Sequence, residues 1–118
     1  MEKTLLLKNE TTNKTLAKDV VVAKTFSQRS KGLLGKDYFP EEKTMWIKRC
    51  QSIHTFFMKF SLDVVFVNKD LVVTHTLYDL KPWRVTPYYI SAASVFEFSS
   101  GSLNSEHINI GDQLYVGH

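Results

Sequence analysis

The chain has 118 residues, of which 43% are hydrophobic and 23% charged, and its formal net charge at pH 7 is +3. These values predict one soluble globular domain that spans residues 1–118. The lone Cys50 excludes an internal disulfide, and no apolar run reaches the length of a membrane span or of a signal peptide, so we expect a cytoplasmic protein without membrane contact.

Runs of β-branched and aromatic residues between turn-forming residues predict a series of short strands. The predicted strands are Thr4–Lys8, Asp19–Thr25, Thr44–Lys48, Ser52–Met58, Leu62–Val67, Leu71–Thr76, Val95–Phe98 and Gln113–Val116. One short helix is predicted over Gln28–Leu34, with Ser27 as its N-terminal cap and Gly35 as the left-handed residue after its end.

These elements predict a mainly β fold, because strands dominate and do not alternate with helices. We expect an antiparallel β-sandwich or a closed barrel, with the short helix in the N-terminal third. Pro82 and Pro87 indicate that Tyr78–Pro87 is a long connection rather than a strand. A turn is predicted at Lys59-Phe60-Ser61, where the most apolar part of the chain is interrupted.

The stretch Ile53–Val67 is apolar but contains His54, Lys59 and Asp63. A strand that is apolar on both faces is covered on both sides or lines a cavity. Each polar residue also has a structural interpretation: a hydrogen-bonded core histidine, a solvated lysine, and an aspartate that caps backbone N–H groups. Glu97, between Phe96 and Phe98, either faces water or lies in a pocket.

Several blocks of the sequence resemble a prokaryotic group, domain-of-unknown-function family 192. The blocks are Ala23-Lys24-Thr25, Arg29 to Gly35, His54 to Lys59, Leu62 to Phe66, Leu80 to Arg84, Ala92 to Phe98 and Gly111-Asp112. The resemblance extends from about residue 20 to the end and departs from the family pattern at Ser61, usually proline, and Phe98, usually leucine. It implies a compact, mostly β fold with a short helix near the start, and it implies no activity.

We predict that the polar and aromatic residues of these blocks form one ligand-binding pocket. The predicted ligand-binding residues are Arg29, His54, Met58, Trp83, Arg84 and Glu97. Arginine offers a planar fork for carboxylate or phosphate, and tryptophan offers a flat face for a ring. No catalytic residue, cofactor or metal site is assigned.

Three functions are compatible with these residues. The first is a binding module for a polar or anionic small molecule or a protein partner. The second is a small hydrolase that uses His54 with Asp63 or Glu97. The third is nucleic-acid binding by residues 1–36, which hold eight Lys or Arg and three acidic residues; we expect this least, because the lysines are dispersed.

Two further predictions concern individual side chains. Phe57 and Phe66 are expected to be buried, so that truncation of either to alanine costs about 3–5 kcal/mol of stability. His54 and Glu97 are expected to line the same pocket, with Arg29 or Arg84 at its mouth, because isolated polar groups among apolar strands are costly unless they are paired or reach solvent.

Overall fold

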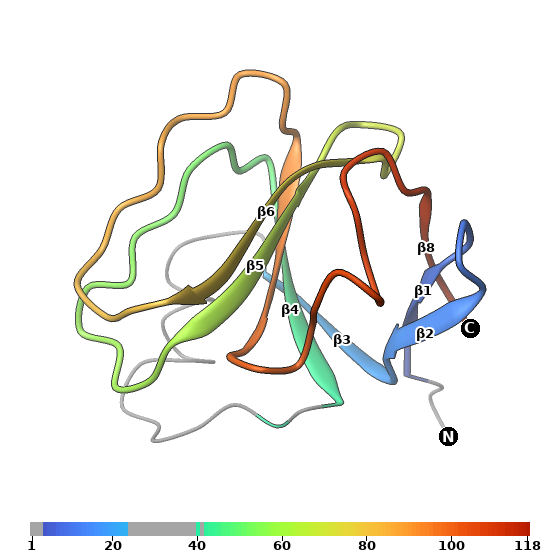
Figure 1. The fold of residues 1–118 in the computed structure, drawn as a ribbon, viewed down its shortest axis with the longest axis horizontal. Coiled ribbons are helices and arrows are strands. Elements are labelled where there is room, and N and C mark those ends of the chain that lie inside the picture. The colour runs from blue at the N-terminus through green and yellow to red at the C-terminus, as the bar shows by residue number, and fades with distance from the viewer. Residues whose placement is uncertain (1–3, 24–39, 41) are drawn as a thin grey trace.

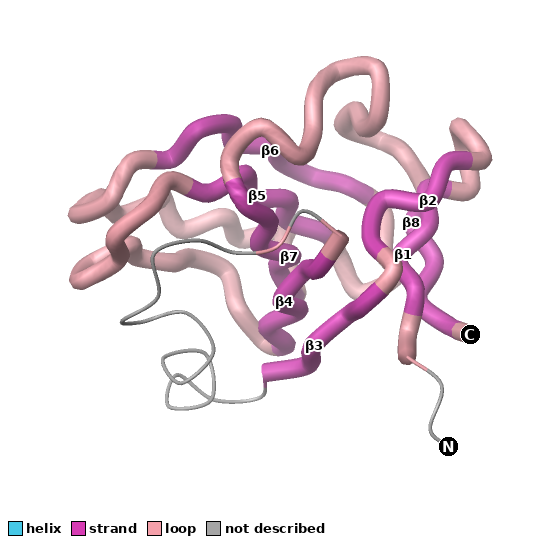
Figure 2. The backbone as a smooth tube through the Cα atoms, turned by 90° about the horizontal axis from the view of Figure 1, so that it is seen from below, coloured by secondary structure: helices cyan, strands magenta, loops and turns pink. Residues whose placement is uncertain are grey.

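The computed structural model describes residues 4–23, 40 and 42–118, and within these residues the secondary structure is strand and loop (Figure 1, Figure 2). The strands are β1 (Leu6–Asn9), β2 (Lys14–Ala17), β3 (Asp19–Ala23), β4 (Lys43–Lys48), β5 (Leu62–Val67), β6 (Val73–Leu80), β7 (Ser94–Ser99) and β8 (Leu114–Gly117). The helix predicted over Gln28–Leu34 falls outside the described residues.

The strands form two sheets rather than the closed barrel that was one of the two predicted forms. The larger sheet has the order β3-β4-β7-β5-β6, and the smaller has the order β2-β1-β8 (Figure 1). The Val20 N–H bonds the Leu5 carbonyl (2.9 Å), and an isolated bridge joins Val72 to Gln113. These contacts connect the two sheets, but the strand-to-strand hydrogen bonds of one sheet do not continue into the other.

The prediction that all strands are antiparallel is wrong for one pair. β3 and β4 run parallel, with Asp19 opposite Lys43 and Ala23 opposite Ile47. A parallel pair needs a long crossover between its strands. The 19 residues from 24 to 42, between β3 and β4 in the sequence, are enough for such a connection.

The central strands β5 and β7 separate two apolar cores. Along β5, Val64 and Phe66 pack on one face of the large sheet, whereas Val65 and Val67 pack on the other, against residues of the small sheet. This follows from the alternation of side chains along a strand. Of the two predicted environments for this stretch, covered on both sides or lining a cavity, the structure shows the first for β5, since all six of its residues are buried.

Strand prediction was wrong for Ser52–Met58. This segment contains only one isolated bridge, between His54 and Val85, and lies in the loop from β4 to β5. In addition, β2 was not predicted, and β6 continues to Leu80, into the region predicted as a connection. Most of the predicted ligand-binding residues that the structure describes lie in the loop at residues 50–60 or beside it.

Candidate functional site

Two long loops run side by side along one end of the large sheet. They comprise residues 50–60, between β4 and β5, and residues 81–93, between β6 and β7; we term them the paired loops (Figure 1). Five backbone hydrogen bonds join the two loops. In each, the N–H of the first residue donates to the carbonyl of the second: Cys50 to Ala93 (3.1 Å), Tyr89 to Gln51 (2.9 Å), Thr86 to Ile53 (3.0 Å), Thr55 to Arg84 (2.8 Å) and Trp83 to Thr55 (3.0 Å). Ile53, Met58 and Ala92 pack from these loops onto the core face that contains Val64 and Phe66.

Two buried threonines hold the paired loops together. The Thr55 hydroxyl donates to the Lys81 carbonyl (2.6 Å) and accepts from the Arg84 N–H (2.9 Å). The Thr86 hydroxyl accepts from the Ile53 N–H (3.0 Å). Side-chain bonds of this kind replace regular ladder bonds and fix irregular backbone. Sequence analysis did not select these threonines, because an isolated threonine gives no signal of its partner.

Two exposed aromatic residues of the paired loops have an unusual backbone conformation. Phe57 has φ 67° and is 65% exposed, and Trp83 has φ 64° and is 56% exposed. Each occupies the third position of a tight turn, where a positive φ normally favours glycine or asparagine. Their ring centroids are 4.7 Å apart in an edge-to-face contact. The prediction that Phe57 is buried is therefore wrong, because the turn directs its side chain outward.

Two of the predicted ligand-binding residues adjoin this aromatic pair. His54 stacks on Phe56 with ring centroids 4.8 Å apart, and Phe56 in turn stacks on Trp83 at 5.8 Å. The histidine Nδ1 accepts a hydrogen bond from the Phe56 N–H (3.3 Å). Arg84 is exposed directly after Trp83. The structure thus groups His54, Trp83 and Arg84 with Phe56 and Phe57, from two loops distant in sequence.

The charge of the paired loops is positive. Residues 49–61 and 81–93 contain Arg49, Lys59, Lys81 and Arg84 but no aspartate or glutamate. Lys81 bonds Asp79 at the end of β6 (2.6 Å), and this bond, with a weaker contribution from Ser100, lowers the pKa of the Asp79 carboxyl. Arg49 and Arg84 are exposed, so the surface favours an anionic group.

Met58 and Glu97, which were predicted to bind a ligand, are both buried in the structure. Met58 is 4% exposed and packs in the core beneath the paired loops. Glu97 is fully buried on β7, opposite Met45 and Val64, and so on the same face of the sheet as the paired loops. That His54 and Glu97 line one pocket stays a prediction. Arg29 falls outside the described residues.

Asp63 has a structural role. One carboxylate oxygen accepts from the Asp79 N–H (2.9 Å), and the other accepts from Gly101 (3.0 Å) and Leu103 (3.1 Å). Asp63 lies opposite Phe98 of β7, and paired residues share a face of the sheet. The Asp63 side chain is therefore on the face opposite that of Glu97. The two carboxylates are therefore separated by the sheet and cannot act as an acid–base pair. The predicted capping role of Asp63 agrees with this geometry.

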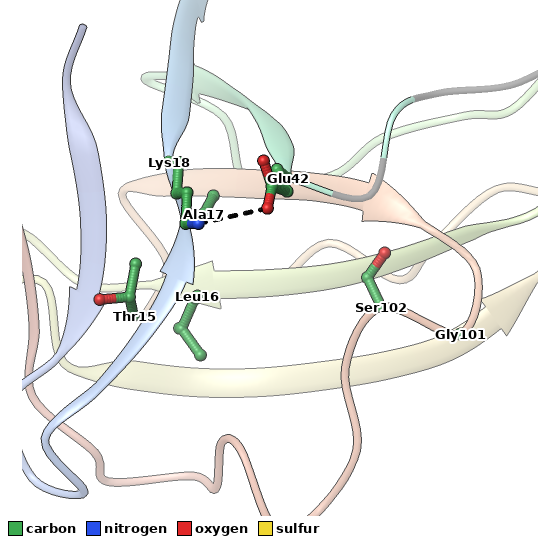
Figure 3. Close-up of a pocket in the computed structure, with 7 residues that line it drawn as sticks. All are labelled: Thr15, Leu16, Ala17, Lys18, Glu42, Gly101 and Ser102. Atoms are coloured by element: carbon green, nitrogen blue, oxygen red, sulfur yellow. Dashed lines mark ion pairs between the residues drawn. The ribbon is translucent and has the colours of Figure 1, made fainter.

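A shallow pocket of about 250 Å³ lies elsewhere, between β2 and the turn after β7 (Figure 3). Lys18 and Glu42 form an ion pair there at 3.4 Å, with both side chains mostly exposed. An exposed pair of this kind contributes little to stability or recognition. The pocket contains none of the predicted ligand-binding residues.

Within residues 4–23, 40 and 42–118, no group of three or more His, Cys, Asp or Glu is placed to hold a metal ion. The same part of the chain has no helix long and apolar enough to cross a membrane.

Comparison with known proteins agrees with the resemblance in the sequence. Residues 7–116 match the model of domain-of-unknown-function family 192, described as "Uncharacterized ACR". The chain belongs to this family. A UPF0127 protein of Pyrococcus horikoshii is 30% identical over 114 residues, which cover 92% of this chain and 96% of the relative.

Two solved structures share the fold of this family member. One is a protein of unknown function from Novosphingobium aromaticivorans, with a TM-score of 0.77, 19% identity and coverage of 94% of this chain and 82% of that chain. The other is a proposed transcription regulator from Sinorhizobium meliloti, with a TM-score of 0.76, 19% identity and coverage of 95% and 91%. At this level of identity the likeness concerns the fold alone.

Proposed function

We propose that this protein is a binding module and that the paired loops form its recognition surface. The observation that carries the proposal is the exposed pair Phe57 and Trp83, each with a left-handed backbone. A bulky residue in this conformation costs about 1–3 kcal/mol, and such strain is typical of functional sites. Exposed aromatic rings next to arginine suit a ligand with an apolar or planar part and a negative charge.

The hydrolase alternative loses support for one of its two carboxylates, Asp63, whereas the use of His54 with Glu97 stays a prediction. Both carboxylate oxygens of Asp63 are occupied by backbone N–H groups, and the side chain lies on the far face of the sheet from the loop that carries His54. A general base must reach the proton that it removes. Asp63 is directed away from the paired loops and does not meet this requirement with His54.

The nucleic-acid alternative depended on the basic N-terminal third. Among its described lysines, Lys14 donates to the Glu106 carbonyl (3.1 Å) and Lys18 pairs with Glu42. These side chains serve contacts within the protein. The cationic and aromatic groups of the paired loops lie closer together than the dispersed lysines of the N-terminal third.

The proposal is tested by two-dimensional ¹H–¹⁵N NMR with mixtures of amino acids, nucleoside monophosphates, sugar phosphates and random octapeptides. We expect one class to shift the amides of residues 53–57 and 83–90. Trp83→Gly, which accepts the positive φ but removes the ring, should weaken this binding by about tenfold or more. Tyr115→Ala, an exposed aromatic residue on β8, is the matched control and should bind as wild type. Shifts confined to other surfaces would overturn the proposal.

A further inference from the structure

The outer edge of the paired loops has the hydrogen-bonding pattern of an open strand edge. The bridge between His54 and Val85 is made by flanking bonds, from Thr86 N–H to Ile53 O and from Thr55 N–H to Arg84 O. In an antiparallel pair, residues bridged in this way direct their own N–H and C=O groups away from each other. The N–H and C=O of Val85 therefore point outward, and the residue is 61% exposed.

Apolar side chains flank these outward groups along the same loop. Besides Trp83 and Val85, Tyr88 is 68% exposed and Ile90 is 85% exposed. Large exposed apolar residues that gather along one segment indicate an interaction site. Pro87 has no N–H group, so hydrogen bonding along the edge ends close to Val85.

The charged residues near this edge indicate the charge of the partner that it would bind. Arg84 lies next to Val85, and Arg49 lies exposed at the other end of the paired loops, beyond the Cys50–Ala93 bond. Residues 49–61 and 81–93 contain no acidic residue, and although Lys81 is paired with Asp79, Arg49 and Arg84 are exposed, so the surface carries a net positive charge. Such a surface favours a negatively charged partner and disfavours a basic one.

We propose that the paired loops bind an extended, acidic segment of a partner protein, which adds as a short strand along the edge at Val85. This inference rests on the proposed function and names its ligand class. The partner's backbone pairs with the Val85 N–H and C=O, its apolar side chains contact Trp83 and Tyr88, and its carboxylates face Arg84 and Arg49. Strand addition of this kind draws affinity from backbone bonds and specificity from side-chain contacts. A nucleic acid would leave the outward backbone pair of Val85 without a complementary strand.

The test is selection of a phage-displayed random octapeptide library on the full chain, followed by affinity measurement of the enriched peptides. We expect peptides in which Asp or Glu alternates with aliphatic or aromatic residues. Val85→Pro removes the outward N–H and should weaken binding by about tenfold or more, whereas Val85→Ala keeps it and should bind within about threefold of wild type. Thermal unfolding verifies that both variants fold. If Val85→Pro does not fold, Arg84→Glu replaces it, with the same expected loss for acidic peptides.

Other results separate the two proposals. Peptides without acidic residues, or acidic peptides that bind Val85→Pro as well as wild type, would overturn the strand-addition proposal. An oligothymidylate or a phosphatidylglycerol vesicle could instead bind the paired loops and lose this binding in Trp83→Gly. That result would overturn the proposal of an acidic protein partner but would support the recognition surface. If the library fails to bind the paired loops, the strand-addition proposal falls. The recognition surface falls as well if the NMR mixtures, the oligonucleotide and the vesicles also leave the paired loops unbound.

Discussion

Phe57 and Phe66 belong to the same apolar stretch, yet their environments are opposite. Phe66 is fully buried on β5, in contact with the edge of the Tyr89 ring at a centroid distance of 4.9 Å. Phe57 lies at the third position of the turn that the Met58 N–H closes on the Thr55 carbonyl (3.2 Å). A positive φ at this position turns the side chain outward, so the conformation of one residue decides whether an aromatic ring joins the core or the surface.

Substitutions at Phe57 and Phe66 should therefore have different effects on stability. Phe66→Ala should cost about 3–5 kcal/mol, as for a buried aromatic residue. At Phe57, glycine should be more stable than alanine by about 1 kcal/mol, since both remove the ring but only glycine adopts a positive φ without strain. Chemical denaturation measures both differences. Phe57→Ala at least as stable as Phe57→Gly would show that this backbone is not strained.

At the scale of elements, the paired loops behave as an irregular extension of the β structure. They are extended and hydrogen-bonded, but the bonds are interrupted by the turns at Phe57 and Trp83 and replaced in part by threonine hydroxyls. This construction presents side chains that a regular strand would bury. Loops positioned on a rigid scaffold commonly carry binding residues, and the buried strands β5 and β7 provide that scaffold here.

Thr55→Val should loosen the paired loops. Valine has nearly the same volume but leaves the Lys81 carbonyl and the Arg84 N–H without their hydroxyl partner, which should cost about 1–3 kcal/mol. The control Thr15→Val, at an exposed position of β2, should change stability by less than about 0.5 kcal/mol. Thermal or urea unfolding gives both values. Equal effects at the two positions would contradict the anchoring role of Thr55.

At the scale of the whole molecule, the core is divided between two faces of one sheet. β5 and β7 are neighbours at its centre, and nearly all of their side chains are buried. The small sheet covers one face, and the paired loops cover part of the other. The paired loops therefore rest on strands whose residues are nearly all buried.

Amide hydrogen exchange should follow this arrangement. We expect the slowest exchange in β5 and β7, because their amides open only with the whole core, and faster exchange in residues 83–90, most of which are exposed. Exchange measured by NMR or mass spectrometry tests this directly. Protection of residues 83–90 equal to that of β5 would mean that the paired loops are part of the core.

Local sequence was sufficient to predict β5 and β7. A run rich in β-branched and aromatic residues favours a strand that is buried on both faces, and Leu62–Val67 was predicted with its observed bounds. The same logic identified β1, β3, β4 and β8 to within about two residues, the usual uncertainty of strand ends. His54, Trp83 and Arg84, which were predicted to bind a ligand, lie close together, and their role in binding stays a prediction.

Tertiary structure alone decided which segments pair. The parallel pairing of β3 with β4, the separation of Asp63 from Glu97 by the sheet, and the bonding of residues 50–60 to residues 81–93 all join positions distant along the chain. A residue's type limits whether it forms a strand, but its partner depends on which other segments bury their apolar faces beside it. The exposure of Phe57 has the same origin, because the hydrogen bonds of Thr55 to the other loop fix the turn that carries it.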